Sequence, residues 1–199
     1  RELALEYLDA GARAVMIGTK ATPEFLSGLP RERLIAALDT NKGTIMVEGW
    51  TKATDQELFA RIEALKPYVG GFLITTIDRE GEMNGFDFER AQAIVDAAKG
   101  SRVTFAGGAS GGKEGAEQIG RLDAMGADVQ AGTAIATGAL SLASAFSAPL
   151  RTDRPDGLWP TAVCDEGGRV LGLVYSEMES LEASFQSGRG VYKARTRGL

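Results

Sequence analysis

The stretch GGFLITTIDREGEMNGFDFERAQAIVDAAKGSRVTFAGG, residues 70–108, decides the fold, because it reads as a strand, a helix and a second strand. Both ends are continuously apolar rather than alternating, which is typical of strands buried on both faces of a parallel sheet. Between them, residues 87–100 carry apolar side chains at helical spacing. Asp87 is placed to cap the start of this helix and Gly100 to end it. The stretch therefore predicts a βαβ unit.

The same alternation extends over residues 1–147. Further strand-like runs are ARAVMIG, RLIAALD and ADVQAGTA, and further helical patterns are TDQELFARIEAL, KEGAEQIGRLDAM and TGALSLASAF. In the first helical pattern, Thr54 and Glu57 have the spacing of a capping box. Repeated strand-helix units predict a parallel α/β sheet, either open and doubly wound or closed into a barrel.

The residues that end the strands favour the barrel. Each run closes on small or polar residues: Gly18-Thr19, Asp39, Thr75-Thr76, Gly107-Gly108 and Gly132-Thr133. Such residues at the carboxyl ends of successive strands are typical of the active face of a (β/α)8 barrel. We therefore predict a partial TIM barrel over residues 1–147 with about five of the eight βα units.

The composition changes near residue 148. Residues 148–157 are rich in Pro, Arg and Asp and are predicted to be a linker. Residues 158–199 then read as two strands around the turn Glu166-Gly167-Gly168, a short helix and a further strand, GVYKA. This pattern predicts the start of a small α+β domain with antiparallel pairing.

The numbers of histidine and cysteine residues limit the kinds of catalysis and cross-linking that the chain can carry out. The chain has no histidine, so acid-base catalysis has to use Asp and Glu, helped by Lys, Tyr or water. The single cysteine, Cys164, excludes an internal disulfide and is expected to be a buried structural thiol, because it lies in the apolar run TAVC. No metal ligands are predicted within the chain.

Net charge and hydropathy limit the classes of partner that the chain is expected to bind. A net charge of -5 argues against nucleic acid. No apolar run is long enough to span a bilayer and no secretory leader is visible, so we expect no membrane association and a cytoplasmic location. Because Arg1 opens directly into a helix and Leu199 stops within a basic segment, we expect an internal piece of a longer protein.

Glycines supply the first candidate site. Gly107-Gly108 and Gly132-Thr133 would let backbone N–H groups approach a phosphate, with Ser110 nearby. Gly18-Thr19 would form a second anion site. The alternative is that these glycines only permit tight turns between strand and helix.

Asp39 and Trp50 are the next candidates. Asp39 is either an acid-base residue on the active face or a cap for the next turn. Trp50 follows it by one hairpin and is either a platform for a flat substrate or an aromatic of a satellite core.

Five segments together resemble a known family. ARAVMIGTKAT, RLIAALDTNKGTIMVEGWTKAT, FLITTIDREGEMNG, VTFAGGASGG and ADVQAGTAIATG are similar, in this order, to the histidine-biosynthesis barrel that isomerises a phosphoribosylated aminoimidazole carboxamide, and to its sister cyclase. The resemblance covers most of residues 1–140. It implies a small substrate with a phosphate at each end and no cofactor in the barrel.

The resemblance also assigns roles to residues. It makes Asp39 the acid-base residue and Thr75 a catalytic hydroxyl, and Trp50 stacks on the substrate. It places the phosphates against the glycine turns: Gly18, Thr19, Gly107, Gly108, Gly132 and Thr133.

The loop after the TTI run departs from the family pattern R-D-G-T. This chain has Arg79-Glu80-Gly81-Glu82, so Glu80 would keep the catalytic carboxylate and Gly81 would contact phosphate, but Glu82 replaces a threonine. The family's other essential Asp would precede Arg1. This departure supports an alternative in which the barrel is a non-catalytic structural or assembly domain.

A second resemblance covers residues 154–198. RPDGLWPTAVCDEGGRVLGLVYS and the segment after it are similar to the beginning of phosphoribosyl-AMP cyclohydrolase, as arranged in fungal-type multifunctional histidine enzymes. Arg195 and Arg197 would then face a substrate phosphate; the alternative is a solvated basic strand. The resemblance implies zinc, and allows magnesium, on ligands downstream of Leu199, and it allows a homodimer through this domain. Under both resemblances the full-length protein is an isomerase and a hydrolase of histidine biosynthesis, and the piece alone is inactive.

Overall fold

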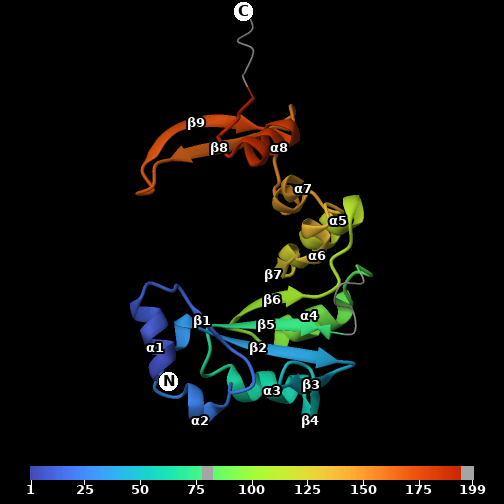
Figure 1. The fold of residues 1–199 in the computed structure, drawn as a ribbon. Coiled ribbons are helices and arrows are strands. Elements are labelled where there is room, and N and C mark those ends of the chain that lie inside the picture. The colour runs from blue at the N-terminus through green and yellow to red at the C-terminus, as the bar shows by residue number, and fades with distance from the viewer. Residues whose placement is uncertain (78–82, 194–199) are drawn as a thin grey trace, which may run out of the picture.

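A parallel sheet forms the centre of the computed structural model, which describes residues 1–77 and 83–193 (Figure 1). Its strands lie in the order β1-β2-β5-β6-β7, and every neighbouring pair in this order is parallel. The bounds are β1 (Val15–Ile17), β2 (Leu34–Asn41), β5 (Gly71–Thr76), β6 (Arg102–Ala106) and β7 (Ala127–Gln130). The predicted α/β fold with five parallel strands of a partial (β/α) barrel is confirmed.

Helices lie before, between and after the parallel strands. They are α1 (Glu2–Asp9), α2 (Pro23–Leu26), the 3-10 turn η1 (Arg31–Arg33), α3 (Leu58–Leu65), α4 (Phe88–Ala97), α5 (Gly112–Ala124), α6 (Thr133–Ala136) and α7 (Leu142–Ser147). Helix α4 begins where the sequence predicts, because the Asp87 side chain accepts a hydrogen bond from the Arg90 backbone N–H at 3.0 Å. The predicted cap thus satisfies one of the free N–H groups at the helix start.

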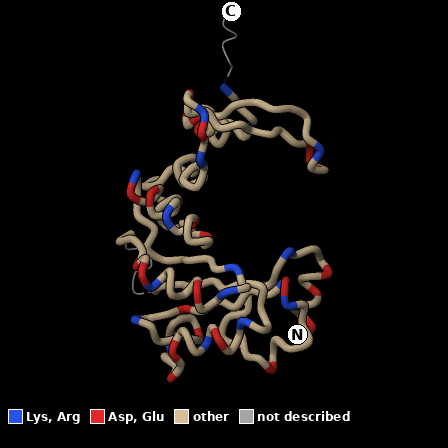
Figure 2. Tube along the Cα trace, turned by 180° about the vertical axis from the view of Figure 1, so that it is seen from behind, with Lys and Arg blue, Asp and Glu red and all other residues tan. Residues whose placement is uncertain are grey.

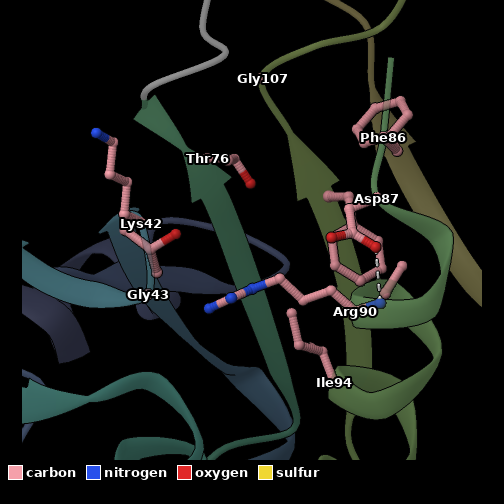
Figure 3. Close-up of a pocket in the computed structure, with 11 residues that line it drawn as sticks. Lys42, Gly43, Thr76, Phe86, Asp87, Arg90, Ile94 and Gly107 are labelled. Carbon is pink, nitrogen blue, oxygen red and sulfur yellow. Dashed lines mark hydrogen bonds between the residues drawn. The ribbon is translucent and has the colours of Figure 1, made fainter.

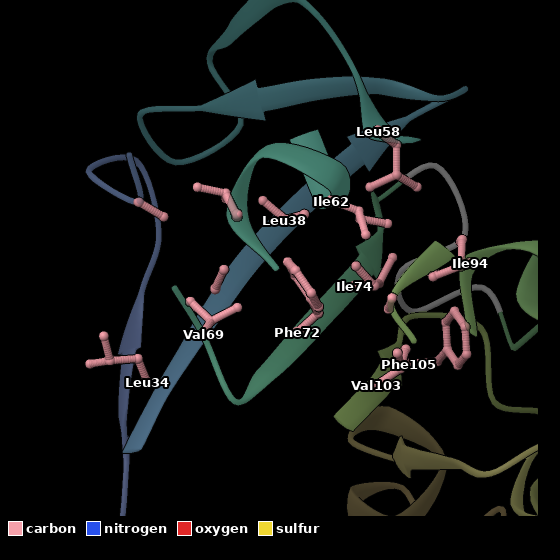
Figure 4. Packing of buried hydrophobic residues seen from close by; sticks show 14 of the residues in the cluster. Leu34, Leu38, Leu58, Ile62, Val69, Phe72, Ile74, Ile94, Val103 and Phe105 are labelled. Atoms are coloured by element: carbon pink, nitrogen blue, oxygen red, sulfur yellow. The ribbon is translucent and has the colours of Figure 1, made fainter. Parts of the chain in front are cut away.

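One face of the sheet packs against α3 and α4 (Figure 4). Strand side chains alternate between faces, and on this face they include Leu38, Phe72, Ile74 and Phe105, all buried. Leu58, Ile62 and Leu65 of α3 and Ile94 of α4 complete this core. The residues between them in sequence lie on the opposite face, where Asp39 and Leu73 are half-buried and Thr75 is buried.

Residues 52–57 differ from the prediction. They form strand β4 (Lys52–Glu57), which pairs antiparallel with β3 (Thr44–Val47), and β3 pairs antiparallel with the end of β2. The Thr54 hydroxyl donates to the Ile45 carbonyl at 3.0 Å instead of capping a helix. Helix α3 starts only at Leu58, and its N-cap, Glu57, makes no side-chain hydrogen bond. The predicted capping box is therefore wrong.

Asp39 does not end its strand. Strand β2 continues to Asn41, which pairs with Thr44 across a two-residue turn. Lys42 and Gly43 form this turn with φ values of 49° and 95°. Two successive positive φ values are typical of the type I′ turn, which matches the twist of a hairpin.

The C-terminal part is a separate antiparallel hairpin, β8 (Trp159–Cys164) and β9 (Val170–Ser176), followed by α8 (Met178–Ser187). Of the predicted third strand, the described residues up to Lys193 form one bridge, between Tyr175 and Lys193. Cys164 is exposed, so its predicted burial is wrong: it lies at the outer end of β8, beside the turn. Figure 2 shows charged residues gathered at that turn, while the two strands carry none.

Among the helices of the described residues, none has both the length and the apolar character needed to cross a membrane.

Candidate functional site

Asp39 and Thr75 lie side by side at the carboxyl edge of the sheet. The parallel register pairs Asp39 with Thr75, Thr75 with Ala106, and Ala106 with Gln130. Partners in register point to the same face, which here is the face opposite to α3 and α4. Asp39 is half-buried, and the described residues place no hydrogen bond on its carboxylate. A carboxylate of this kind can give or accept a proton.

The residues predicted to bind one phosphate lie together at the ends of β6 and β7, next to β5. Gly107 and Gly108 follow β6 with φ values of 80° and 113°, a region that favours glycine. They line a pocket of about 10 Å³ together with Gln130, Gly132, Thr133 and Met83. This volume admits about one water-sized group, so a phosphate would insert one oxygen and keep the others at the mouth. We call this pocket the glycine cradle.

Gly18, Thr19 and Trp50 form a second group. The turn between β3 and β4 lies beside the end of β1, because the Glu48 backbone N–H donates to the Thr19 hydroxyl at 3.2 Å. Trp50 lies in this turn and is 45% exposed, which contradicts the alternative of a core aromatic. Two strands, β2 and β5, separate β1 from β6. The two glycine turns are therefore roughly 14 Å apart at the usual strand spacing.

Four predicted site residues lie outside the described residues: Glu80, Gly81, Arg195 and Arg197. Their roles stay predictions. In the described part of the chain, no group of three or more His, Cys, Asp or Glu side chains is arranged to hold a metal ion.

A pocket that the sequence did not indicate lies on the helix side of the sheet (Figure 3). It has a volume of about 120 Å³ and is lined by Thr40, Thr76, Arg90 and apolar residues of α4 and β6. Arg90 reaches from α4 to the β2–β3 turn, where a Cβ on Gly43 would lie 3.0 Å from its Nη2 atom. The available signal was strand alternation, since Thr40 and Thr76 each follow a predicted site residue and so point to the other face.

Fold and site together define the class of protein. Parallel strands joined by helices, with a carboxylate and glycine turns at the carboxyl edge, are the architecture of (β/α) barrel proteins. The family model described as "Histidine biosynthesis protein" matches residues 1–141, and the chain belongs to this family.

Relatives with assigned names agree with the family. The chain is 36% identical over 124 residues to a 1-(5-phosphoribosyl)-5-((5-phosphoribosylamino)methylideneamino)imidazole-4-carboxamide isomerase from Ruthia magnifica, covering 59% of this chain and 49% of the relative. It is 33% identical over 149 residues to the isomerase of the same name from Methanothrix thermoacetophila, covering 71% and 60%. It is also 47% identical over 62 residues to the histidine biosynthesis trifunctional protein of Neurospora crassa, covering 31% and 7%. The chain thus spans about half of the Ruthia isomerase and a small part of the fungal protein.

Proposed function

We propose that this chain supplies an acid-base carboxylate and a phosphate cradle to an aldose-ketose isomerase of histidine biosynthesis. The observation that carries the proposal is the row at the carboxyl edge of the sheet, where Asp39 and Thr75 are in register and the glycine cradle follows on the next strand. The names of the Ruthia and Methanothrix relatives support the substrate, a phosphoribosylated aminoimidazole carboxamide.

The proposed chemistry needs only proton transfers. Opening the sugar ring requires a proton on the ring oxygen. Forming the ketose requires loss of the proton at C2, delivery of a proton to C1 and loss of the C2 hydroxyl proton, so that protons balance over the reaction. Since the chain has no histidine, carboxylates are the natural carriers. Asp39 protonates the ring oxygen, and a second carboxylate on the other side of the sugar accepts the C2 proton. Thr75, buried beside Asp39, holds a substrate hydroxyl in place.

The two glycine turns suit a substrate with a phosphate at each end. The glycine cradle takes one phosphate through backbone N–H groups. The turn at Gly18 and Thr19 takes the other, with Trp50 exposed beside it to stack on the imidazole ring. Their separation of roughly 14 Å leaves room for a flat ring and a ribose between them.

The cradle is tested by Gly108→Ala in the full-length protein. Because Gly108 has a φ of 113°, alanine strains the turn, and we expect KM for the isomerase substrate to rise at least about tenfold, or about 1.4 kcal/mol. Gly100→Ala is the matched control, since Gly100 also has a positive φ, 92°, but lies at the end of α4. Equal effects of the two substitutions would contradict the cradle. If the unmutated protein neither turns over nor binds the substrate, the barrel is structural.

For residues 158–199 we propose the start of a phosphoribosyl-AMP cyclohydrolase, joined to the barrel by a linker at 148–157. The opening DGLWP, at residues 156–160, and the strand pair and helix that follow it in sequence support this proposal. As part of this proposal, the cyclohydrolase uses zinc or magnesium, the protein forms a dimer through this part, and it is located in the cytoplasm. Measuring cyclohydrolase activity of the full-length protein with and without a zinc chelator tests it.

A further inference from the structure

Gln118 is a buried polar side chain in the middle of α5, only 7% exposed. Its amide oxygen accepts a hydrogen bond from the Ser110 backbone N–H at 3.0 Å. Its amide nitrogen donates to the Ser110 hydroxyl at 2.8 Å and to a Glu114 carboxylate oxygen at 3.1 Å. Gln118 therefore holds both the backbone and the side chain of Ser110, just beyond the glycine turn of β6.

The backbone N–H of Ser110 fixes the orientation of the Gln118 amide. A backbone N–H can only donate, so the amide oxygen of Gln118 has to face Ser110 N and its NH2 group has to face the Ser110 hydroxyl. The hydroxyl accepts from Gln118 and donates its own proton to the Met83 carbonyl at 2.9 Å, the nearer of its two acceptors, since the Glu114 carboxylate oxygen lies at 3.5 Å. A single chain of hydrogen bonds thus runs from α5 through Ser110 to the segment after β5.

The far end of this chain lies at the glycine cradle. Met83 lines the cradle with Gly107 and Gly108 and has a φ of 53°. A non-glycine residue keeps such a conformation only when its surroundings hold it there. Two residues on, the Gly85 N–H donates to the Gly108 carbonyl at 2.7 Å, and a Cβ on Gly85 would lie 2.7 Å from the Gln118 amide nitrogen. Hydrogen bonds therefore join Met83 and Gly85, which follow β5, to the loop after β6, and Gln118 packs against this junction.

We propose that Gln118 is a positioning residue for phosphate binding: it acts through Ser110 to hold Met83 and Gly108 in the shape that takes the phosphate. This inference rests on the proposed function, because it assigns a residue to the proposed cradle. Gln118 does not line the cradle itself. Its contribution is preorganisation, which improves affinity by removing the cost of ordering the loops on binding.

Gln118→Glu is the sharpest test, because glutamate has the same shape but no donor. Its second carboxylate oxygen accepts the Ser110 proton, so Ser110 no longer donates to the Met83 carbonyl. The added charge also faces Glu114, and Glu114→Gln/Gln118→Glu removes this repulsion while keeping the net charge. Glu117→Gln, on the exposed side of the same helix, is the control for a change of charge on α5.

Two measurements on the whole chain separate the outcomes. In Gln118→Glu and in the double variant we expect hydrogen exchange at the Gly85 amide to accelerate at least about tenfold, while exchange at the core amides of Phe72 and Ile74 changes much less. The dissociation constant of inorganic phosphate, followed by NMR shifts of the Gly108 and Thr133 amides, should rise at least about fivefold in both variants, about 1 kcal/mol. Glu117→Gln should change neither quantity.

Three results would contradict the proposal for Gln118. Unchanged Gly85 exchange in Gln118→Glu would overturn the positioning role. Recovery of both quantities in the double variant would do the same, since repulsion from Glu114 would then explain the loss. If the unmutated chain does not bind inorganic phosphate, the proposed cradle itself fails, and the assignment of Gln118 to phosphate binding fails with it.

Discussion

Gly115 is a residue of α5 that lies against the loop after β6. A Cβ at this position would overlap the Ser110 carbonyl oxygen, a backbone atom that cannot turn away. We expect Gly115→Ala to lower the free energy of unfolding by about 1–3 kcal/mol, as overpacking of a tight contact does. Gly18→Ala is the control, because Gly18 has ordinary φ and no atom within 4 Å of the new methyl group. Urea denaturation of both variants measures the difference, and equal stabilities would contradict the close approach.

Single residues were predictable where their neighbours in sequence decide their role. Asp87 caps α4 because the signal and the N–H that it satisfies are three residues apart. The exposure of Cys164 was not predictable from the sequence, because it depends on what covers that end of the hairpin. The role of Gln118 was not predictable either. It bonds to Ser110, and Ser110 bonds to Met83, only because the loops after two strands come together in the fold.

At the scale of elements, the parallel strands were predictable and the segment 52–57 was not. Continuous apolar runs mark strands buried on both faces, and each of the five runs is a strand. Lys52–Glu57 has the polar composition of an exposed helix turn, yet pairing with β3 makes it a strand. Local sequence signals are weak compared with such tertiary pairing.

The face that α3 turns to the sheet can be tested with two phenylalanines. Phe72 in β5 is 1% exposed and packs against α3, whereas Phe59 in α3 is 39% exposed. We expect Phe72→Ala to cost about 3–5 kcal/mol of unfolding free energy and Phe59→Ala less than about 1 kcal/mol. Thermal or urea unfolding provides the numbers. A large loss for Phe59→Ala would mean that α3 presents a different face to the sheet.

For the whole molecule, one face of the sheet carries the core and the opposite face carries the candidate site residues Asp39 and Thr75. Helices α3 and α4 cover the first face, so Asp39 and Thr75 are left on the other. The hairpin β8–β9 projects away from the sheet (Figure 1), and α7 contacts α8 through an edge-to-face pair of Phe146 and Phe185 with ring centroids 5.7 Å apart. Strand order and the side-by-side placement of the strand-end residues followed from the βαβ pattern. The helix-side pocket around Arg90 did not, because no local pattern brings α4 and the β2–β3 turn together.

The central claim, that Asp39 moves a proton in an isomerase reaction, is tested most directly by Asp39→Asn in the full-length protein. Asparagine keeps the shape of the side chain but cannot exchange a proton, so we predict that kcat for the isomerase substrate falls about 10²- to 10⁴-fold. Substrate affinity should stay within roughly tenfold, about 1.4 kcal/mol, because the glycine turns supply the binding. Asp55→Asn, on the exposed strand β4, is the control and should retain full turnover. A kcat of Asp39→Asn equal to that of the unmutated protein would contradict the account.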